Sequence, residues 1–199
     1  MFPSAFLPLL MGGQVSQYEC PAYESIRQPG VDATRFSADM FAGKWYVVAT
    51  TEPTIPSFCT CNVLQVHVHS RTYDYKDDTI CLGKHMALTM KGELSSDTTA
   101  PGLLHETASL FNHTLGPLVP NMIFDVDYDD AGRASSLFTY ACLGKVFGRS
   151  LFSFSMLSRS FHGLDEAQVR GRVEQAALST RGLLDAGGMR IADAAAFRR

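Results

Sequence analysis

Short runs in which apolar and polar residues alternate follow one another from about Phe41 to about Arg159. A period of two residues is typical of a β-strand with one dry face and one wet face. The runs cover residues 62–69, 85–94, 103–111, 121–128, 136–143 and 151–158, with turn residues between them. No helical pattern interrupts them, so successive strands are expected to pair as antiparallel neighbours. Because closure removes exposed edges, the sequence predicts an all-β, up-and-down meander closed into a barrel.

The period changes after Arg159. A helical stripe joins Val169, Val173, Ala176, Thr180 and Leu183, with Asp165-Glu166 suited to its first turn and Gly187-Gly188 to its end. We therefore expect one C-terminal α-helix, packed on the outside of the barrel. Residues 1–36 lack a sustained period and are rich in proline and glycine, which predicts an irregular N-terminal extension. The expected division is 1–36 extension, 37–186 barrel and helix, and 187–199 C-terminal tail.

The chain has 199 residues, of which 46% are hydrophobic and 19% charged, and its formal net charge is −3. This size and composition fit one globular domain. The weak negative charge gives no reason to expect a nucleic-acid partner. The apolar segment Phe2–Met11 contains two prolines and no basic residue precedes it, so it is expected to be neither a spanning helix nor a complete signal peptide.

Five dispersed cysteines are candidates for disulfide bonds: Cys20, Cys59, Cys61, Cys81 and Cys142. No Cys-x-x-Cys motif occurs, so the usual zinc and thioredoxin spacings are missing. Cysteines spread over different predicted strands are what an oxidising compartment cross-links, with one thiol left over. Simple buried thiols are the alternative, and the connectivity stays open.

The first predicted strand begins with Gly43-Lys44-Trp45-Tyr46, and Trp45 is the only tryptophan of the chain. Arg159 stands at the end of the last predicted strand, just before the predicted helix. This arrangement, with residues 36–42 before it, resembles the lipocalin family over about residues 36–186. The resemblance implies an eight-stranded barrel in which Gly43, Trp45 and Arg159 form the structural closure of one end, with a cation–π contact between the arginine and the tryptophan.

Within that family, residues 36–46 and 157–160 look most like the lipocalin domain of violaxanthin de-epoxidase and related plastid lipocalins. This resemblance implies a thylakoid lumen as the compartment. The acidic catalytic residue of that enzyme has no counterpart here, because the matching stretch reads Ser57-Phe58-Cys59-Thr60-Cys61. We therefore assign no catalytic residue. The triplet Asn112-His113-Thr114 is a glycosylation acceptor that would be used on a secretory route, so a secreted protein is the alternative.

An eight-stranded barrel encloses an interior that is either filled by side chains or holds one small ligand. Methionine and phenylalanine side chains make an adaptable wall suited to a long apolar molecule such as a carotenoid, another pigment, a retinoid or a fatty acid. Simple core filling is the alternative for each of these side chains. The dry faces of the predicted strands give the expected lining: Leu64, Val66, Met86, Leu88, Met90, Phe124, Phe138, Tyr140, Phe152, Phe154 and Met156.

Two pairs of polar residues are candidate sites. His67 and His69 share one strand face, and solvated surface is favoured over a metal site, so no metal is expected. His105 and Glu106 point to opposite faces, which argues against an acid–base pair. Glu106 either faces the interior, where it could orient a ligand hydroxyl or serve as an acid, or is an ordinary surface residue, which is the favoured reading.

Two further groups are read as surface. Ser153, Ser155, Ser158 and Ser160 lack a Gly-x-Ser-x-Gly elbow and a histidine partner, so they are expected to face outward. The acidic run Asp125, Asp127, Asp129 and Asp130 lacks the framework of an EF-hand loop and is expected to be a wet strand face and turn.

Three hypotheses about function follow. The first is a binding protein that holds one small elongated apolar ligand in its barrel and needs no cofactor besides such a ligand. The second is a non-catalytic peripheral subunit of a larger assembly, such as a photosynthetic membrane complex, contacted through residues 1–36 and 187–199. The third, an enzyme resembling a carotenoid de-epoxidase, rests on family analogy alone.

Overall fold

The computed structural model describes residues 21–51, 58–110, 113–114, 118–146, 149–162, 165–180, 183–193 and 197. Eight long strands dominate it: β1 (Gly43–Thr50), β2 (Cys59–Val68), β3 (Thr72–Cys81), β4 (Lys84–Leu94), β5 (Leu103–Leu110), β7 (Val119–Tyr128), β8 (Ala134–Val146) and β9 (Arg149–Ser158). Two short strands, β6 (His113–Thr114) and β10 (Arg190–Ile191), pair with β5 and β1. The predicted runs of alternation fall on strands, except for His69, which lies just beyond β2, and Phe111, which lies outside the described residues.

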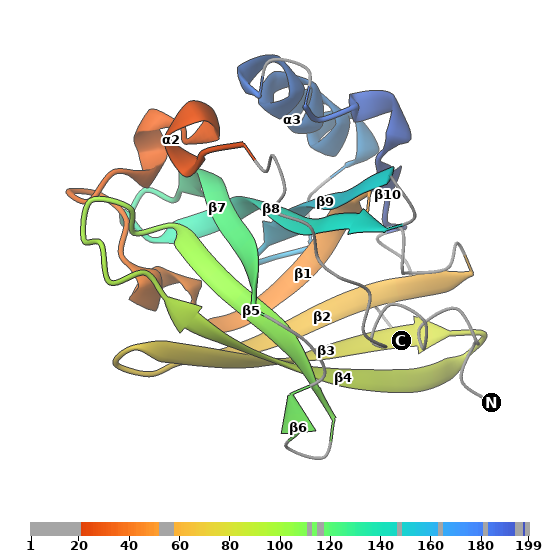
Figure 1. Ribbon diagram of the computed structural model, residues 1–199. Helices are drawn as coiled ribbons and strands as arrows, with labels where there is room; N and C mark the ends of the chain where they lie inside the picture. The colour runs from red at the N-terminus through yellow and green to blue at the C-terminus, as the bar shows by residue number, and fades with distance from the viewer. Residues whose placement is uncertain are drawn as a thin grey trace.

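The long strands form a closed antiparallel barrel. Each pairs with the next along the chain, and β9 returns to pair with β1. Figure 1 shows the barrel, with the turns between strands alternating between its two ends. Closure lets the backbone N–H and C=O groups of the first and last strands hydrogen-bond to each other. A chain of successive antiparallel strands therefore leaves no exposed edge when it closes. The predicted eight-stranded up-and-down barrel is confirmed.

Strand β3 was missing from the sequence prediction. Its residues Thr72–Cys81 contain three aspartates and a lysine, which obscure the dry face formed by Tyr73, Tyr75 and Cys81. The strand is nevertheless paired along its whole length with β2 and β4. Tertiary pairing therefore overrides the weak local β-propensity of this segment.

The segment before the barrel is partly ordered against it. It forms α2 (Tyr23–Ile26) and two 3₁₀ turns, η1 (Pro29–Val31) and η2 (Ala38–Phe41). Ile26 and Val31 are buried, and the Tyr23 hydroxyl donates to the Ile123 carbonyl of β7. From Tyr23 onward the predicted irregular extension is thus packed on the outside of β7, while residues 1–20, including Phe2–Met11, lie outside the described residues.

One α-helix follows the barrel, as predicted. Helix α3 spans Glu166–Ser179 and is capped by the Asp165 side chain, which accepts from the Gln168 backbone N–H. It buries Val169, Val173 and Ala176. The helix ends at Ser179, before the predicted end at Gly187-Gly188. Thr180 follows it, and its hydroxyl oxygen accepts a hydrogen bond from the Leu184 N–H. Ala186–Gly188 form a separate 3₁₀ turn, η3. No helix among the described residues is long and apolar enough to cross a membrane.

Candidate functional site

One end of the barrel, here called the floor, is closed around Trp45. The Arg159 guanidinium lies 3.6 Å from the centroid of the Trp45 ring, and the indole N–H donates to the Phe41 carbonyl at 2.7 Å. Arg159 also donates to the backbone carbonyls of Met40, Lys44 and Ala134. Gly43 has a positive φ of 99°, and a Cβ there would lie 2.9 Å from an Arg159 nitrogen. These contacts seal the floor with a cation–π stack and a set of hydrogen bonds.

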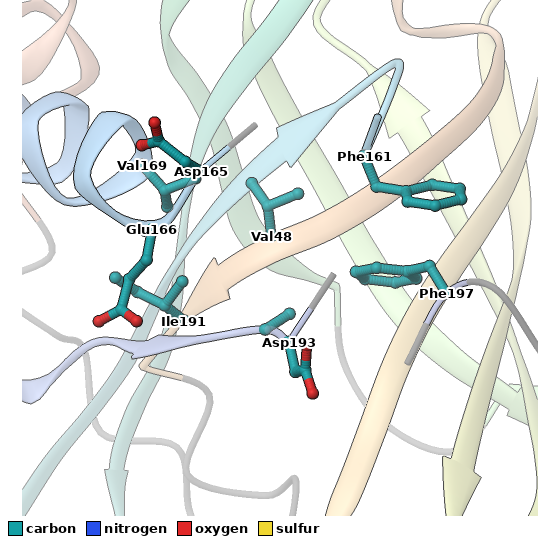
Figure 2. A pocket seen from close by; sticks show the side chains of 9 residues that line it. Val48, Phe161, Asp165, Glu166, Val169, Ile191, Asp193 and Phe197 are labelled. Atoms are coloured by element: carbon teal, nitrogen blue, oxygen red, sulfur yellow. The ribbon is translucent and has the colours of Figure 1, made fainter. Parts of the chain in front are cut away.

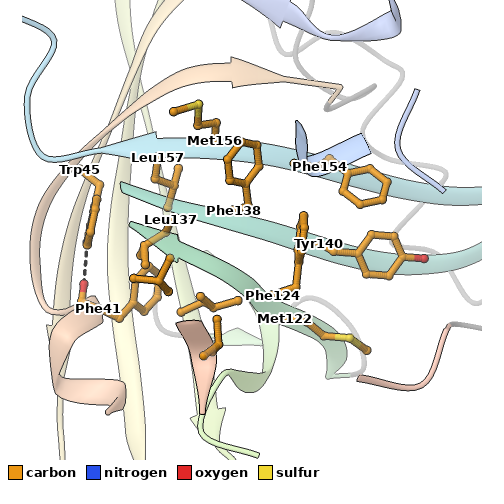
Figure 3. Packing of buried hydrophobic residues seen from close by; sticks show 14 of the residues in the cluster. Phe41, Trp45, Met122, Phe124, Leu137, Phe138, Tyr140, Phe154, Met156 and Leu157 are labelled. Atoms are coloured by element: carbon orange, nitrogen blue, oxygen red, sulfur yellow. Dashed lines mark hydrogen bonds between the residues drawn. The ribbon is translucent and has the colours of Figure 1, made fainter. Parts of the chain in front are cut away.

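The strand register shows which side chains point into the barrel. Trp45 is opposite Leu64 on β2, and its neighbour on the same face, Val47, is opposite Leu157 on β9. Leu157 is in turn opposite Leu137 on β8. Since paired residues share a face, Leu137 and Leu157 point inward with Trp45. Figure 3 shows both leucines turned toward Trp45 and Phe41.

The aromatic residues of β8 and β9 therefore face outward. Phe138 and Met156 alternate with the inward leucines, and Arg172 of the external helix α3 stacks 5.7 Å over the Phe138 ring. Phe124 joins them because a β-bulge in β7 interrupts its alternation, and its ring contacts those of Phe138 and Phe154. The prediction that these side chains line the interior is wrong. They form a second apolar layer on the outer wall: Phe124, Phe138, Tyr140, Phe152, Phe154 and Met156.

The other five predicted lining residues do point inward. Leu64 and Val66 share the face of Trp45, and Met86, Leu88 and Met90 lie opposite inward residues of β3. Exposure falls along β4 from the β3–β4 turn toward the floor. Met86 is 41% exposed, Leu88 and Met90 are half-buried, and Gly92 is buried. Solvent therefore reaches the inner face from the β3–β4 end, which is called the mouth below.

A buried carboxylic acid lies inside the barrel, toward the floor. Glu106 on β5 is opposite Gly92 on β4, which is opposite Tyr73 on β3. Glu106 Oε2 accepts the Tyr75 hydroxyl at 3.0 Å and the Tyr73 hydroxyl at 3.3 Å. Burial and the neighbouring Glu106 charge raise the pKa of both phenols well above the usual value. The favoured reading of Glu106 as a surface residue is wrong, and its interior alternative is confirmed.

Further polar side chains share the inner face. Asn62 lies opposite Val47, and Asn121 is a diagonal neighbour of Glu106 that hydrogen-bonds Tyr73. Ser153 lies two residues from Ser155, which bonds Thr50 across the β1–β9 pair. The outward placement predicted for Ser153 and Ser155 is therefore wrong. Sequence reasoning missed Asn62, Tyr73, Tyr75 and Asn121, although the Tyr73-Asp74-Tyr75 alternation was a signal.

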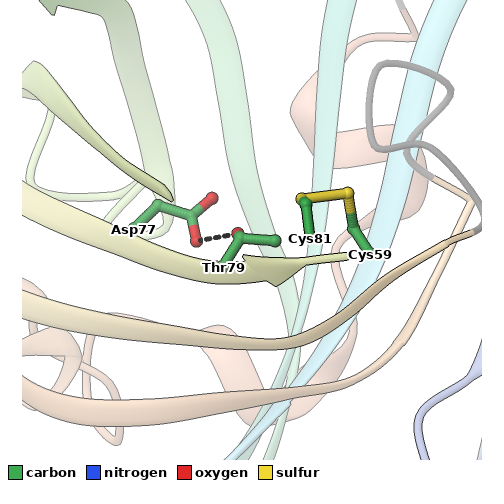
Figure 4. The surroundings of a disulfide bond; sticks show 4 residues. All are labelled: Cys59, Asp77, Thr79 and Cys81. Atoms are coloured by element: carbon green, nitrogen blue, oxygen red, sulfur yellow. Dashed lines mark hydrogen bonds between the residues drawn. A yellow bond between two sulfur atoms is a disulfide. The ribbon is translucent and has the colours of Figure 1, made fainter. Parts of the chain in front are cut away.

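The mouth is cross-linked. Cys59 at the start of β2 and Cys81 at the end of β3 form a disulfide beside Thr79 and Asp77 (Figure 4). Cys142 is also disulfide-bonded. Cys20 and the side chain of Cys61 lie outside the described residues, as does Asn112 of the glycosylation triplet. The predicted disulfide chemistry, expected in an oxidising compartment, is confirmed for Cys59 and Cys81.

The histidine and aspartate groups lie on the outer surface. His67 and His69 both contact the exposed Asp74 carboxylate, at 3.2 and 3.0 Å, and their hydrogen bonds lower its pKa. Within the described part of the chain, no group of three histidine, cysteine or acidic residues is arranged to hold a metal ion. Arg172 of α3 binds Asp127 at 2.6 Å and so fastens the helix to β7.

Two hollows lie outside the barrel. A pocket of about 360 Å³ separates α3 from β1, with Phe161 and Phe197 on one side and acidic side chains on the other (Figure 2). Asp165 in this pocket caps α3 and Glu166 pairs with Arg170, so both side chains stabilise the helix. The second hollow, about 550 Å³, lies beneath the floor beside Arg159 and Arg133. Neither has the inward polar cluster that distinguishes the barrel interior.

Several solved structures are similar to this chain in overall fold. Insecticyanin from the tobacco hornworm Manduca sexta has a TM-score of 0.61 and 16% identity, covering 80% of this chain and 81% of its own. The chain has the lipocalin fold. Lobster apocrustacyanin A1 has a TM-score of 0.57 and 19% identity, with 77% of each chain covered. The siderocalin Ex-FABP has a TM-score of 0.52 and 14% identity, covering 77% and 93%.

The sequence itself matches no family model and no curated protein. At identities of 14–19% these similarities show the fold alone and carry no information on what the interior binds.

Proposed function

We propose that this protein is a lipocalin that binds one small elongated ligand, with a largely apolar body, in its barrel. The observation that carries the proposal is the graded exposure of the inward face of β4, from exposed Met86 at the mouth to buried Gly92 near the floor. A cup that is open at one end and sealed by Trp45 and Arg159 at the other admits a ligand from one direction only. A carotenoid, another pigment or a retinoid fits such a shape.

Two further observations support a binding role. The siderocalin Ex-FABP, which has the same fold, functions through dual ligand specificities. The inward methionines and leucines of β2 and β4 provide an adaptable apolar wall. We further propose that the protein works in an oxidising compartment, either secreted or in a thylakoid lumen, because its mouth is held by a disulfide.

The second hypothesis, a subunit tethered through residues 1–36 and 187–199, receives no support from the described parts of those segments. Ile26 and Val31 are buried against the barrel, and Ile191 pairs with Ala49 of β1. These residues have contacts within the chain and so are not presented to a partner.

The test combines extraction and titration. Organic extraction of natively purified protein, followed by absorption and mass analysis, should recover a stoichiometric small molecule. Emptied protein should bind the apolar dye diphenylhexatriene, and Leu88→Trp, which fills the interior beneath the mouth, should weaken binding at least tenfold. The control is Leu178→Trp on the outer face of α3, where the leucine is 83% exposed. Absence of an extracted molecule together with absence of dye binding would contradict the proposal.

A further inference from the structure

The inner end of the barrel carries a hydrogen-bond acceptor. Glu106 is 6% exposed and lies on the inner face of a closed barrel, so the part of it that remains accessible is reached from the interior. A carboxylic acid in such a position costs free energy unless its oxygens are hydrogen-bonded. Two phenol hydroxyls donate to one of those oxygens, which supports the carboxylate form.

Polar side chains surround Glu106 on the inner face. Tyr73 and Tyr75 donate to its carboxylate, and Asn121, its diagonal neighbour on β7, hydrogen-bonds Tyr73. Tyr75 and Asn121 keep 9% and 7% of their surface accessible, whereas Trp45 and Leu104 on the same face keep 1% or less. A ligand that reaches these polar groups must satisfy them or leave them desolvated.

Gly92 makes this arrangement possible. A Cβ at position 92 would lie 2.3 Å from carbons of the Tyr73 ring and 2.6 Å from the His105 carbonyl oxygen. Because β4 has no side chain at this point, the Tyr73 ring lies across the strand and its hydroxyl reaches Glu106 on β5. Tyr75 arrives at the same oxygen from the next inward position of β3. The two phenol donors hold the acid in place, so its orientation is fixed before a ligand arrives.

The charge of this cluster discriminates among ligand end groups. The phenols stay protonated at neutral pH, since burial and Glu106 raise their pKa. With Glu106 as the carboxylate that these two donors stabilise, the acid and the two tyrosines together carry one negative charge. In a low-dielectric interior a negative charge attracts an ammonium group, accepts a hydrogen bond from a hydroxyl, and strongly disfavours a second carboxylate.

We propose that Glu106 selects ligands whose inner end is a hydrogen-bond donor, a hydroxyl or a protonated amine, and rejects ligands that end in a carboxylate. This inference rests on the proposed function, because it specifies the end group of the molecule that the barrel binds. It removes fatty acids from the ligand classes that the sequence left open. Hydroxylated pigments, retinoid alcohols and alkyl amines remain.

The experiment uses three ligands with the same chain: dodecylamine, dodecanol and dodecanoate. Each displaces diphenylhexatriene from the full-length, disulfide-bonded protein at neutral pH. The amine and the alcohol should bind at least tenfold more tightly than dodecanoate. In Glu106→Gln, which keeps the shape but removes the charge, the preference for the amine over dodecanoate should fall at least tenfold. His105→Gln, the neighbour on the outer face, is the matched control.

The outcomes separate this inference from the proposed function. If the dye binds but dodecanoate binds as tightly as the amine and the alcohol, or if Glu106→Gln leaves the order unchanged, the inference is overturned and the proposed function stands. If neither the dye nor any of the three dodecyl ligands binds, the proposed function fails and the inference fails with it. Should Glu106→Gln not fold, Tyr75→Phe replaces it: the loss of one donor to the carboxylate should tighten amine binding at least threefold, and unchanged or weaker binding would count against the inference.

Discussion

The ring of Tyr73 occupies the space that a side chain at position 92 would need. Two ring carbons lie 2.3 Å from the position of a Cβ on Gly92, and the ring passes over β4 to bring its hydroxyl to Glu106. A strand glycine often marks such a close approach. Here it allows β3 and β5, which are not hydrogen-bonded neighbours, to share one buried polar cluster.

Gly92→Ala should destabilise the protein by about 1–3 kcal/mol, the usual effect of forcing extra volume into a packed interior. It should also displace Tyr73 from Glu106. Urea denaturation measures the first effect. The matched control is Gly171→Ala in α3, where a Cβ meets nothing within 4 Å and better helix propensity should add about 1 kcal/mol of stability. Equal stability of Gly92→Ala and wild type would contradict the packing described here.

Arg159→Ala should cost about 2–4 kcal/mol of unfolding free energy, because the floor loses a cation–π contact and the hydrogen bonds to three backbone carbonyls. Arg170→Ala, which breaks an exposed pair with Glu166, should cost less than about 0.5 kcal/mol. Thermal and urea unfolding compare the two variants. A small effect of Arg159→Ala would show that the floor does not depend on the stack over Trp45.

The outward placement of the aromatic layer separates stability from binding. Phe154→Leu should lower stability by about 1–2 kcal/mol, because the side chain is buried against Phe124 and Tyr140. Its affinity for diphenylhexatriene should remain that of wild type. Met90→Ala, on the inner face, should change dye affinity. Loss of dye binding in a folded Phe154→Leu protein would restore the lining role that the sequence had suggested.

The raised pKa values of Tyr73 and Tyr75 predict an alkaline limit to stability. In the unfolded chain these phenols ionise near pH 10, whereas in the barrel they stay protonated to higher pH. Their contribution is therefore fully present below about pH 10 and is lost as the pH rises through the folded-state values. Burial also raises the pKa of Tyr23, Tyr128 and Tyr140. Ultraviolet titration should therefore show several tyrosines that do not ionise near pH 10 in the folded protein, and Tyr75→Phe should lower their number by one. Titration of every tyrosine near pH 10 in the folded protein would refute the buried cluster.

The cross-link at the mouth should stabilise the barrel. The Cys59→Ser, Cys81→Ser double variant should lose about 2–3 kcal/mol, in line with a closed loop of 22 residues. The double substitution is preferable to chemical reduction, because Cys142 is also in a disulfide. Urea unfolding at neutral pH measures the difference. Unchanged stability would show that the β2–β3 pairing alone closes this loop.

The sequence by itself determined the barrel. Alternation with a period of two, turn residues between the runs and one later helical stripe predict a closed antiparallel meander, and the resemblance to lipocalins indicated that Trp45 and Arg159 seal its floor. The helical stripe located α3, although the helix ends at Ser179 and not at the glycine pair that the sequence suggested.

Only the tertiary structure decided which face of each strand is inside. On β8 both faces are dry, since helix α3 covers Phe138 from outside while Leu137 packs toward Trp45, so alternation could not tell the lining from the outer layer. The bulge at Phe124 removed the remaining regularity. The cluster of Tyr73, Tyr75 and Glu106 was equally hidden, because it depends on the register of three strands and on an empty position at Gly92. Such a relationship is set by pairing between distant segments and leaves no local pattern.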